Sequence, residues 1–132
     1  MGMLIIDIDQ FKKINDTYGH PTGDRVIIRV VQIIKSCTRS GDLVGRLGGD
    51  EFCVILVGCT AEQCMQIANR ITQEVTSQRD ILTSALSGIG ICVSIGVCTG
   101  LNTGDSFYDA YQWADAMLYK AKKRGGNCAV AE

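Results

Sequence analysis

Two short apolar runs, at 43–47 and 52–57, flank the tetrapeptide Gly48-Gly49-Asp50-Glu51. A glycine pair between apolar segments is typical of the tight turn of a β-hairpin, because glycine adopts backbone angles that other residues avoid. We therefore predict two antiparallel strands with two acidic side chains at the tip of their turn. This hairpin restricts the fold more than any other feature, since the remaining segments must extend or cover its sheet.

The rest of the chain alternates apolar runs typical of strands with apolar residues at helical spacing. Further strands are predicted at Leu4–Asp9 and 91–97, with a possible edge strand at 128–131. Helices are predicted at about 11–16, 24–37, 60–75 and 107–123, the third opened by a capping box at 60–63. Breaks or loops are expected at 18–21, 78–90 and 99–105. This order predicts one domain over 1–132, of the α+β class, with a single sheet covered by helices.

Composition excludes some function classes. The hydrophobic fraction of 46% is enough for a buried core, and the formal net charge of -1 gives no basic field for nucleic acid. No apolar stretch approaches the ~20 residues of a membrane helix, and no basic leader precedes the first strand. We therefore expect a cytoplasmic domain without membrane contact. Because the chain opens on a strand, we also expect it to belong to a longer protein, which other segments could anchor to a membrane.

The chain contains seven cysteines but no Cys-x-x-Cys pair, and its only histidine is His20. A zinc or thiol-redox protein is therefore poorly supported, for want of ligand spacing. Most of the cysteines lie in apolar runs, where a reduced thiol behaves as a small hydrophobic side chain. We expect all seven to be buried and structural, in a reducing compartment.

Two pairs of acids are candidates for chemistry. Asp7 and Asp9 are two residues apart on a predicted strand and so point to the same side, while Asp50 and Glu51 lie at the hairpin tip. If the first strand lies beside the hairpin, carboxylates from both places converge, as suits Mg²⁺ and phosphoryl transfer. Two glycines next to Asp50 leave backbone exposed where a phosphate could approach. Alternatively, Asp7 and Asp9 cap the following helix and Asp50 is a polar turn residue.

Five ordered blocks carry a resemblance to a known family. The blocks are Asp7–Asp16 with Gly19-His20 and Gly23-Asp24, then Arg46–Phe52, Val93–Val97, Ala114-Asp115 and Tyr119–Lys122. Together they resemble the GGDEF domains, the diguanylate cyclases, over nearly the whole chain, from Leu4 to about Asn127. The fold that this implies is palm-like, ferredoxin-like and of the nucleotide-cyclase type. Its central sheet is mixed, largely antiparallel, of about five strands, and packed with helices.

The resemblance also implies a reaction and its partners. The family condenses two GTP into cyclic di-GMP and two pyrophosphates, at a metal-dependent site shared between two facing domains. The implied partners are GTP, cyclic di-GMP as product and inhibitor, a second copy in a homodimer, and an upstream sensor domain. The implied cofactor is Mg²⁺ or Mn²⁺. A catalytically weak module that binds GTP or cyclic di-GMP and regulates an attached domain is the alternative.

Metal ligands follow from the motif matches. By resemblance, the metal is held by the carboxylates of Asp7 and Asp50 and by the backbone carbonyl of Ile8. Asp50 also helps to deprotonate the attacking 3′-hydroxyl, and it is grouped with Glu51 and Lys12 as catalytic. Glu51 either supports the metal cluster or shapes the turn.

Substrate contacts are implied in the same way. Phe11, through its backbone N–H, and Lys12 hold the β- and γ-phosphates, and Lys122 adds a charge to the triphosphate. The hairpin glycines Gly48 and Gly49 belong to the same substrate site. Alternatively, both lysines are merely solvated charges on helices.

Two polar residues would recognise the base. By resemblance, Asn15 and Asp24 bind the guanine edge, a role that suits a carboxylate because guanine offers N–H donors. Without the resemblance, Asn15 would be a helix-ending residue and Asp24 a helix cap.

Arg39 and Asp42 form the pattern Arg-x-x-Asp, with five residues between Asp42 and Gly48. This arrangement resembles the family's inhibitory site, which binds product dimers, and an arginine fork suits phosphate and guanine.

Two departures from the family are present. Gly126 occupies a position where the family usually has an arginine, so one triphosphate contact is lost unless Arg124 replaces it. The family's first helix, with its Asp-x-Leu-Thr block and Asn-Arg pair, is absent. We expect its absence to leave a sheet face partly uncovered.

Overall fold

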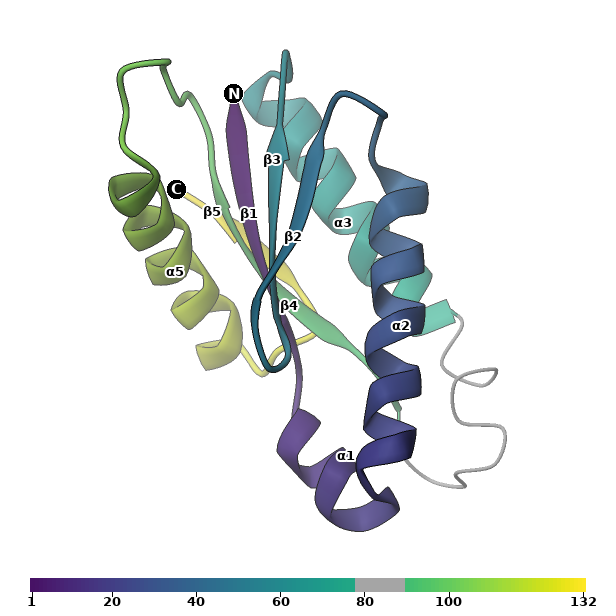
Figure 1. Ribbon diagram of the computed structural model, residues 1–132. Coiled ribbons are helices and arrows are strands. Elements are labelled where there is room, and N and C mark those ends of the chain that lie inside the picture. Colours follow the sequence, from purple (N-terminus) through teal and green to yellow (C-terminus); the bar gives the residue numbers. More distant parts are fainter. Residues whose placement is uncertain (78–89) are drawn as a thin grey trace.

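A computed structural model describes residues 1–77 and 90–132 of the chain. It has the α+β architecture predicted from the sequence, and Figure 1 shows its single sheet between helices. The strands are β1 (Gly2–Ile8), β2 (Leu43–Gly48), β3 (Glu51–Leu56), β4 (Val93–Cys98) and β5 (Ala129–Ala131). The helices are α1 (Phe11–Tyr18), α2 (His20–Cys37), α3 (Ala61–Ser77) and α5 (Phe107–Lys123).

The sheet has the strand order β2-β3-β1-β4-β5. Strand β1 lies in the middle and pairs antiparallel with both β3 and β4, and the hairpin partner β2 pairs antiparallel with β3. Strand β5 pairs parallel with β4 at the far edge, so the predicted edge strand is confirmed. The predicted mixed, largely antiparallel sheet of five strands is therefore correct.

The side chains of β1 point alternately into two apolar layers, one on each face of the sheet. Leu4, Ile6 and Ile8 belong to the larger core, together with residues of α2 and α3. Met3 and Ile5 belong to the second core, which α5 covers from the other face. Figure 1 shows α5 on one side of the sheet and α2 and α3 on the other. Side chains of a strand point alternately to opposite faces, so a residue's parity decides which helices it meets.

Helix α5 lies very close to β4 because Gly96 has no side chain. A Cβ atom at Gly96 would lie 2.0 Å from the Ala114 carbonyl oxygen and 2.3 Å from the Leu118 nitrogen. The backbone of α5 therefore rests on the strand, and any larger residue at Gly96 would push the helix away. This contact fixes the height of α5, and of every side chain on its inner face, above the sheet.

Several local details differ from the sequence predictions. Helix α2 begins at His20 rather than near residue 24, because Pro21 fits the first turn of a helix and Gly19, at φ 89°, supplies the sharp break before it. Phe107, the apolar residue that begins the helix predicted at 107–123, is 52% exposed. The predicted loop at 78–90 lies outside the described residues except for Gly90. The capping box is confirmed, since the backbone N–H of Gln63 donates to Thr60 Oγ1 and that of Thr60 to Gln63 Oε1.

All seven cysteines are reduced thiols outside any disulfide, as predicted, but not all are buried. Four lie in the core, whereas Cys59, Cys92 and Cys128 are half-buried. Among the described helices, none is both long and apolar enough to cross a membrane.

Candidate active site

Asp7 is a buried acid at the end of the central strand. It is 7% exposed, and it lies opposite Glu51 of β3 and Ser94 of β4 in the sheet register. Burial, and next a contact with Asp50, raise the pKa of Asp7 to about 7, although Lys122 acts in the opposite direction. The sheet therefore holds an acid where charge is costly unless a cation neutralises it.

Lys122 of α5 forms an ion pair with Oδ2 of Asp7. Burial lowers the pKa of this lysine, but the nearby acids outweigh burial and the net shift is upward. The other carboxylate oxygen, Asp7 Oδ1, is buried and has no hydrogen-bond partner within residues 1–77 and 90–132. Lys122 therefore lies at the acid cluster, and its contact with the triphosphate of the substrate stays a prediction.

The hairpin turn brings Asp50 to the same place. Gly48 pairs with Glu51, so the turn itself consists of Gly49, at φ 30°, and Asp50. The Ile8 N–H donates to the Asp50 carbonyl oxygen at 3.2 Å, which fastens the turn to the end of β1. The predicted convergence of Asp7 and Asp50 is therefore observed, and the backbone of Ile8 lies beside both. An added Cβ at Gly48 or Gly49 would meet no atom within 4 Å, so the space over the turn is open.

The residues present fit a divalent cation at this point. The donor set comprises two carboxylates and a backbone carbonyl, as hard cations such as Mg²⁺ prefer, and Asp7 Oδ1 is a buried oxygen in need of a partner. Across residues 1–77 and 90–132, no group of three or more His, Cys, Asp or Glu side chains is arranged to hold a metal. A cation here would therefore keep several coordination positions for water or phosphate.

Asp9 points to the same side as Asp7, as predicted, but its carboxylate is already occupied. Ser94 Oγ donates to Oδ1 at 2.7 Å, and Oδ2 accepts from the Asn127 N–H at 2.9 Å and from Cys92 Sγ at 3.3 Å. Asp9 thus ties the end of β1 to β4 and to the segment after α5. The alternative in which Asp7 or Asp9 caps the next helix is wrong, because Gln10 occupies the cap position and no side chain caps α1.

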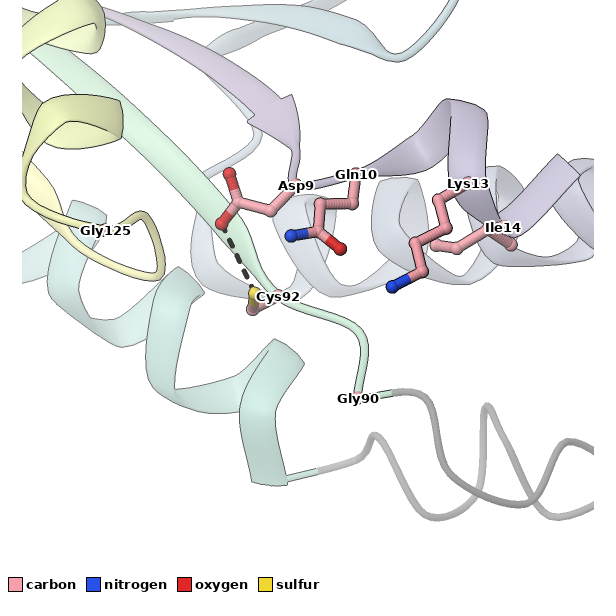
Figure 2. Close-up of a pocket in the computed structure, with 7 residues that line it drawn as sticks. All are labelled: Asp9, Gln10, Lys13, Ile14, Gly90, Cys92 and Gly125. Atoms are coloured by element: carbon pink, nitrogen blue, oxygen red, sulfur yellow. Dashed lines mark hydrogen bonds between the residues drawn. The ribbon is translucent and has the colours of Figure 1, made fainter. Parts of the chain in front are cut away.

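A pocket of about 260 Å³ lies beside Asp9. Figure 2 shows its lining, which also includes Gln10, Lys13, Ile14, Gly90, Cys92 and Gly125. Apart from Asp9, one of the four acids considered for Mg²⁺, none of the residues predicted to bind metal, GTP or product lines it. The candidate active site is instead an open surface around Asp7 and the hairpin turn.

The start of α1 has free backbone donors. Gln10 has φ 54° and makes no capping hydrogen bond with its side chain, so the first N–H groups of the helix, beginning with Phe11, are available to an anion. Lys12 is exposed one residue further on. Both residues follow Ile8 and Asp9 directly, which places these donors next to the acids.

The structure brings Asn15 and Asp24 together. A Cβ at Gly23 would lie 1.8 Å from Asn15 Oδ1, so the side chain of Asn15 rests on the α2 backbone just before Asp24. Among the described residues, none is a hydrogen-bond partner of the buried Asn15 Oδ1, and Asp24 is exposed. Neither residue ends or caps a helix, since α1 continues to Tyr18 and α2 begins at His20. The Asn15 amide thus lies against Gly23, the residue just before Asp24.

Arg39 and Asp42 lie at the other end of β3 from Asp50. Arg39 Nη2 donates to the Val57 carbonyl oxygen at 2.8 Å and to Cys59 Sγ at 2.8 Å. Asp42 accepts from the backbone N–H of Val57 at 3.1 Å and from that of Arg39 at 2.9 Å. The pair therefore joins two loops, and the Arg39 side chain nevertheless stays 62% exposed.

Two residues that support the turn were missed by the sequence analysis. Arg46 donates to the Gly49 carbonyl oxygen, at 2.9 Å from Nε, and holds the turn from within the hairpin. The hydroxyl of Tyr111 in α5 donates to Glu51 Oε1 at 2.8 Å. Arg46 belongs to the same sequence block as the hairpin glycines, so the sequence did contain a signal that could have linked Arg46 to the turn. Nothing in the sequence pairs Tyr111 with Glu51, because they are distant in the chain and meet only through packing.

Comparisons with known proteins agree on one family. The family model described as "Diguanylate cyclase, GGDEF domain" matches residues 1–128. Diguanylate cyclase A of Treponema denticola is 42% identical over 127 residues, which cover 96% of this chain and 34% of the relative. Diguanylate cyclase DosC of Escherichia coli K12 is 38% identical over 128 residues, covering 96% and 27%. The chain therefore spans about a third or less of the length of these relatives.

Solved structures give the same result. The active GGEEF domain of a diguanylate cyclase from Vibrio cholerae matches with a TM-score of 0.87 and 30% identity, covering 98% of this chain and 81% of that one. The GGDEF domain of DgcB from Caulobacter crescentus, in complex with c-di-GMP, matches with a TM-score of 0.86 and 32% identity, covering 98% and 76%.

Proposed function

Because this chain belongs to the GGDEF domain family of diguanylate cyclases, we propose that it condenses two GTP molecules into cyclic di-GMP and two pyrophosphates. The observation that carries this proposal is the meeting of Asp7 with Asp50. A buried acid with a pKa near 7 and an unpartnered oxygen lies against a second acid on an open glycine turn. Such a pair suits phosphoryl transfer, in which charge must be neutralised around a phosphate.

Asp7, Asp50 and the Ile8 carbonyl would hold Mg²⁺ or Mn²⁺, which when bound neutralises phosphate charge and activates the attacking hydroxyl. In the reaction, the 3′-oxygen of one GTP forms a bond to the α-phosphorus of the other. The bond from that phosphorus to its bridging oxygen breaks, and pyrophosphate leaves. Asp50 accepts the proton of the 3′-hydroxyl. The same transfer in the opposite sense closes the ring.

Other groups of the chain orient the substrate. The free N–H groups at the start of α1 and the exposed ammonium of Lys12 bind the β- and γ-phosphates, because a helix N-terminus favours anions. The open backbone of Gly48 and Gly49 lets the phosphates come close to Asp50. Lys122 stabilises the triphosphate from α5, and Glu51 supports the acid cluster from β3.

Asn15 and Asp24 select guanine. The amide of Asn15 and the carboxylate of Asp24 are complementary to the donors and acceptor on the guanine edge. The buried, unpartnered Oδ1 of Asn15 favours a ligand with an N–H donor, since a buried polar atom without a partner is costly. Adenine offers a different pattern at that edge, so GTP is the proposed substrate.

Each domain holds one GTP, so two copies must face each other for the reaction. We propose that this homodimer forms under control of a sensor domain in the full-length protein. Product inhibition is assigned to Arg39 and Asp42, since the exposed Arg39 guanidinium can bind the phosphates of cyclic di-GMP. In that state the bound product holds two active sites apart.

The test is incubation of the purified chain, at high protein concentration, with GTP and Mg²⁺, followed by chromatographic detection of cyclic di-GMP. The Asp50→Asn variant should lose turnover, and Glu62→Gln, an exposed acid of α3, is the matched control that should keep it. A wild-type chain that binds GTP or cyclic di-GMP but forms no product would refute the enzyme and favour the regulatory module. Full activity of Asp50→Asn would refute the assigned role of Asp50.

A further inference from the structure

Helix α5 contacts the acid cluster at two points. Tyr111 donates to Glu51 Oε1 at 2.8 Å, and Lys122 pairs with Asp7. Tyr111 and Lys122 are eleven residues apart, about three helical turns, so they lie on the same face of α5. Asp7 and Glu51 are themselves directly opposite partners on β1 and β3. One helix therefore holds both members of an acidic cross-strand pair.

The ring of Tyr111 is fixed by its neighbours. It packs against the core cluster that includes Met3, Ile5 and Cys53. On its other side it stacks with Phe107, at 6.3 Å between ring centroids and 22° between ring planes. Close contact of α5 with β4 at Gly96 sets the depth of the whole helix. A hydroxyl held this firmly fixes the atom to which it donates.

We propose that Tyr111 is a positioning residue, whose hydroxyl holds the Glu51 carboxylate beside Asp7 and Asp50 in the geometry that a divalent cation with GTP requires. This inference rests on the proposed function and adds to it a residue outside the family motifs. Opposed partners on antiparallel strands are close enough for direct side-chain interaction, so Glu51 is within reach of Asp7. A hydrogen-bond donor at Glu51 stabilises the charged carboxylate of this residue next to Asp50 in the chain and opposite Asp7 in the sheet.

The chemistry of Tyr111 suits this role. The hydrogen bond to Glu51, and to a lesser extent burial, raises the pKa of Tyr111 to about 12. The phenol therefore keeps its proton near neutral pH and remains a donor. Partners that orient the acids of a metal site typically change metal affinity or activity by about 10–100-fold when removed. We expect about a tenfold effect, at the lower end, because Glu51 itself remains in place.

The test compares Tyr111→Phe, which keeps the ring and its stacking, with Tyr108→Phe as the matched control. Tyr108 lies on the same helix, is 66% exposed, and its hydroxyl contacts Gln112 rather than an acid. Two quantities are measured for each: Mn²⁺ affinity without nucleotide, by calorimetry, and kcat and KM for GTP. Both variants are repeated in a Glu51→Gln background.

Tyr111→Phe should weaken Mn²⁺ binding and lower kcat by about tenfold. Tyr108→Phe should change neither quantity. In the Glu51→Gln background, Tyr111→Phe should cause no further loss of Mn²⁺ affinity or of kcat. A purely structural tyrosine would instead lower the melting temperature with Mn²⁺ affinity unchanged, which would overturn the inference. An equal loss with and without Glu51 would also overturn it. If wild type forms no cyclic di-GMP, yet Tyr111→Phe still weakens Mn²⁺ binding, the proposed function fails and the positioning role stands. If wild type binds no Mn²⁺ at all, both fail.

Discussion

Gly126 occupies the position where the family usually has arginine, and the structure explains why another residue is unfavourable there. Its φ is 79°, in the left-handed region, and an added Cβ would lie 2.8 Å from Asp9 Oδ2. We expect Gly126→Ala to destabilise the chain through both effects. A left-handed residue with a side chain costs about 1–2 kcal/mol, partly offset because alanine also restricts the unfolded chain. We take the net backbone cost as about 1 kcal/mol.

The contact with Asp9 adds a second cost. For the new methyl group to fit, the Asp9 carboxylate must move away from the Asn127 N–H, which now donates to it at 2.9 Å. Loss of a hydrogen bond to a charged group costs about 1.5–3 kcal/mol. The total expected for Gly126→Ala is therefore about 2.5–4 kcal/mol, a large part of the stability of a typical domain.

Gly125 supplies the matched control. Its φ is 103°, but an added Cβ would meet nothing within 4 Å, so Gly125→Ala should show the backbone cost of about 1 kcal/mol alone. Urea unfolding followed by circular dichroism gives the free energy of unfolding for each variant. In an Asp9→Ala background, the additional cost of Gly126→Ala should disappear.

Equal destabilisation by Gly125→Ala and Gly126→Ala would refute this reasoning, because the contact with Asp9 would then contribute nothing. A stabilising Gly126→Arg variant would refute it more strongly, since it would mean that the segment after α5 accommodates the family's arginine without strain. In that case the glycine would have no structural cause in this chain.

Four further predictions rest on other contacts. Gly96→Ala should cost at least about 1–3 kcal/mol by displacing α5, whereas Gly45→Ala, with nothing within 4 Å, should cost far less in the same unfolding assay. Burial, aided by the Glu51 charge, raises the pKa of Cys53 to about 11, so at pH 8 its alkylation, followed by mass spectrometry, should be much slower in native than in unfolded protein. The pKa of Cys53 in the folded protein exceeds the reference value of 9.0, so its stabilising contribution is complete below pH 9 and is lost as the pH rises through about 11. Wild type should therefore lose more stability across that range than the Cys53→Ala variant. Arg39→Ala should relieve inhibition by added cyclic di-GMP with the initial rate unchanged, and retained inhibition would contradict the Arg39 assignment.

Much of the site was predictable because its residues lie in local patterns. The hairpin turn and the strand before Asp7 follow from short-range signals, and placing them side by side required one assumption about strand order, which the sheet confirms. Asn15 and Asp24 were assigned only through the resemblance, and their closeness depends on the packing of α1 against α2 at Gly23. Their roles in binding guanine stay predictions.

The amino-acid sequence by itself determined the elements and the position of the acids. Apolar periodicity, turn glycines and the capping box are properties of neighbouring residues, so they can be recognised without a structure. The hairpin turn is also a local feature. Its glycines indicate the position of the turn, and the two acids that follow them therefore lie at its exposed tip. Even the α+β class with a single sheet followed from the order of such local elements.

Tertiary structure alone decided what surrounds those acids. It buried Asp7, left one of its oxygens without a partner and paired the other with Lys122. It brought three hydrogen-bond donors to the Asp9 carboxylate, and it placed the Tyr111 hydroxyl where it donates to Glu51. These contacts join segments far apart in the chain, and those made by Lys122 and Tyr111 depend on how closely α5 approaches the sheet at Gly96. Burial and charge are properties of that packing, so no local pattern of residues contains them.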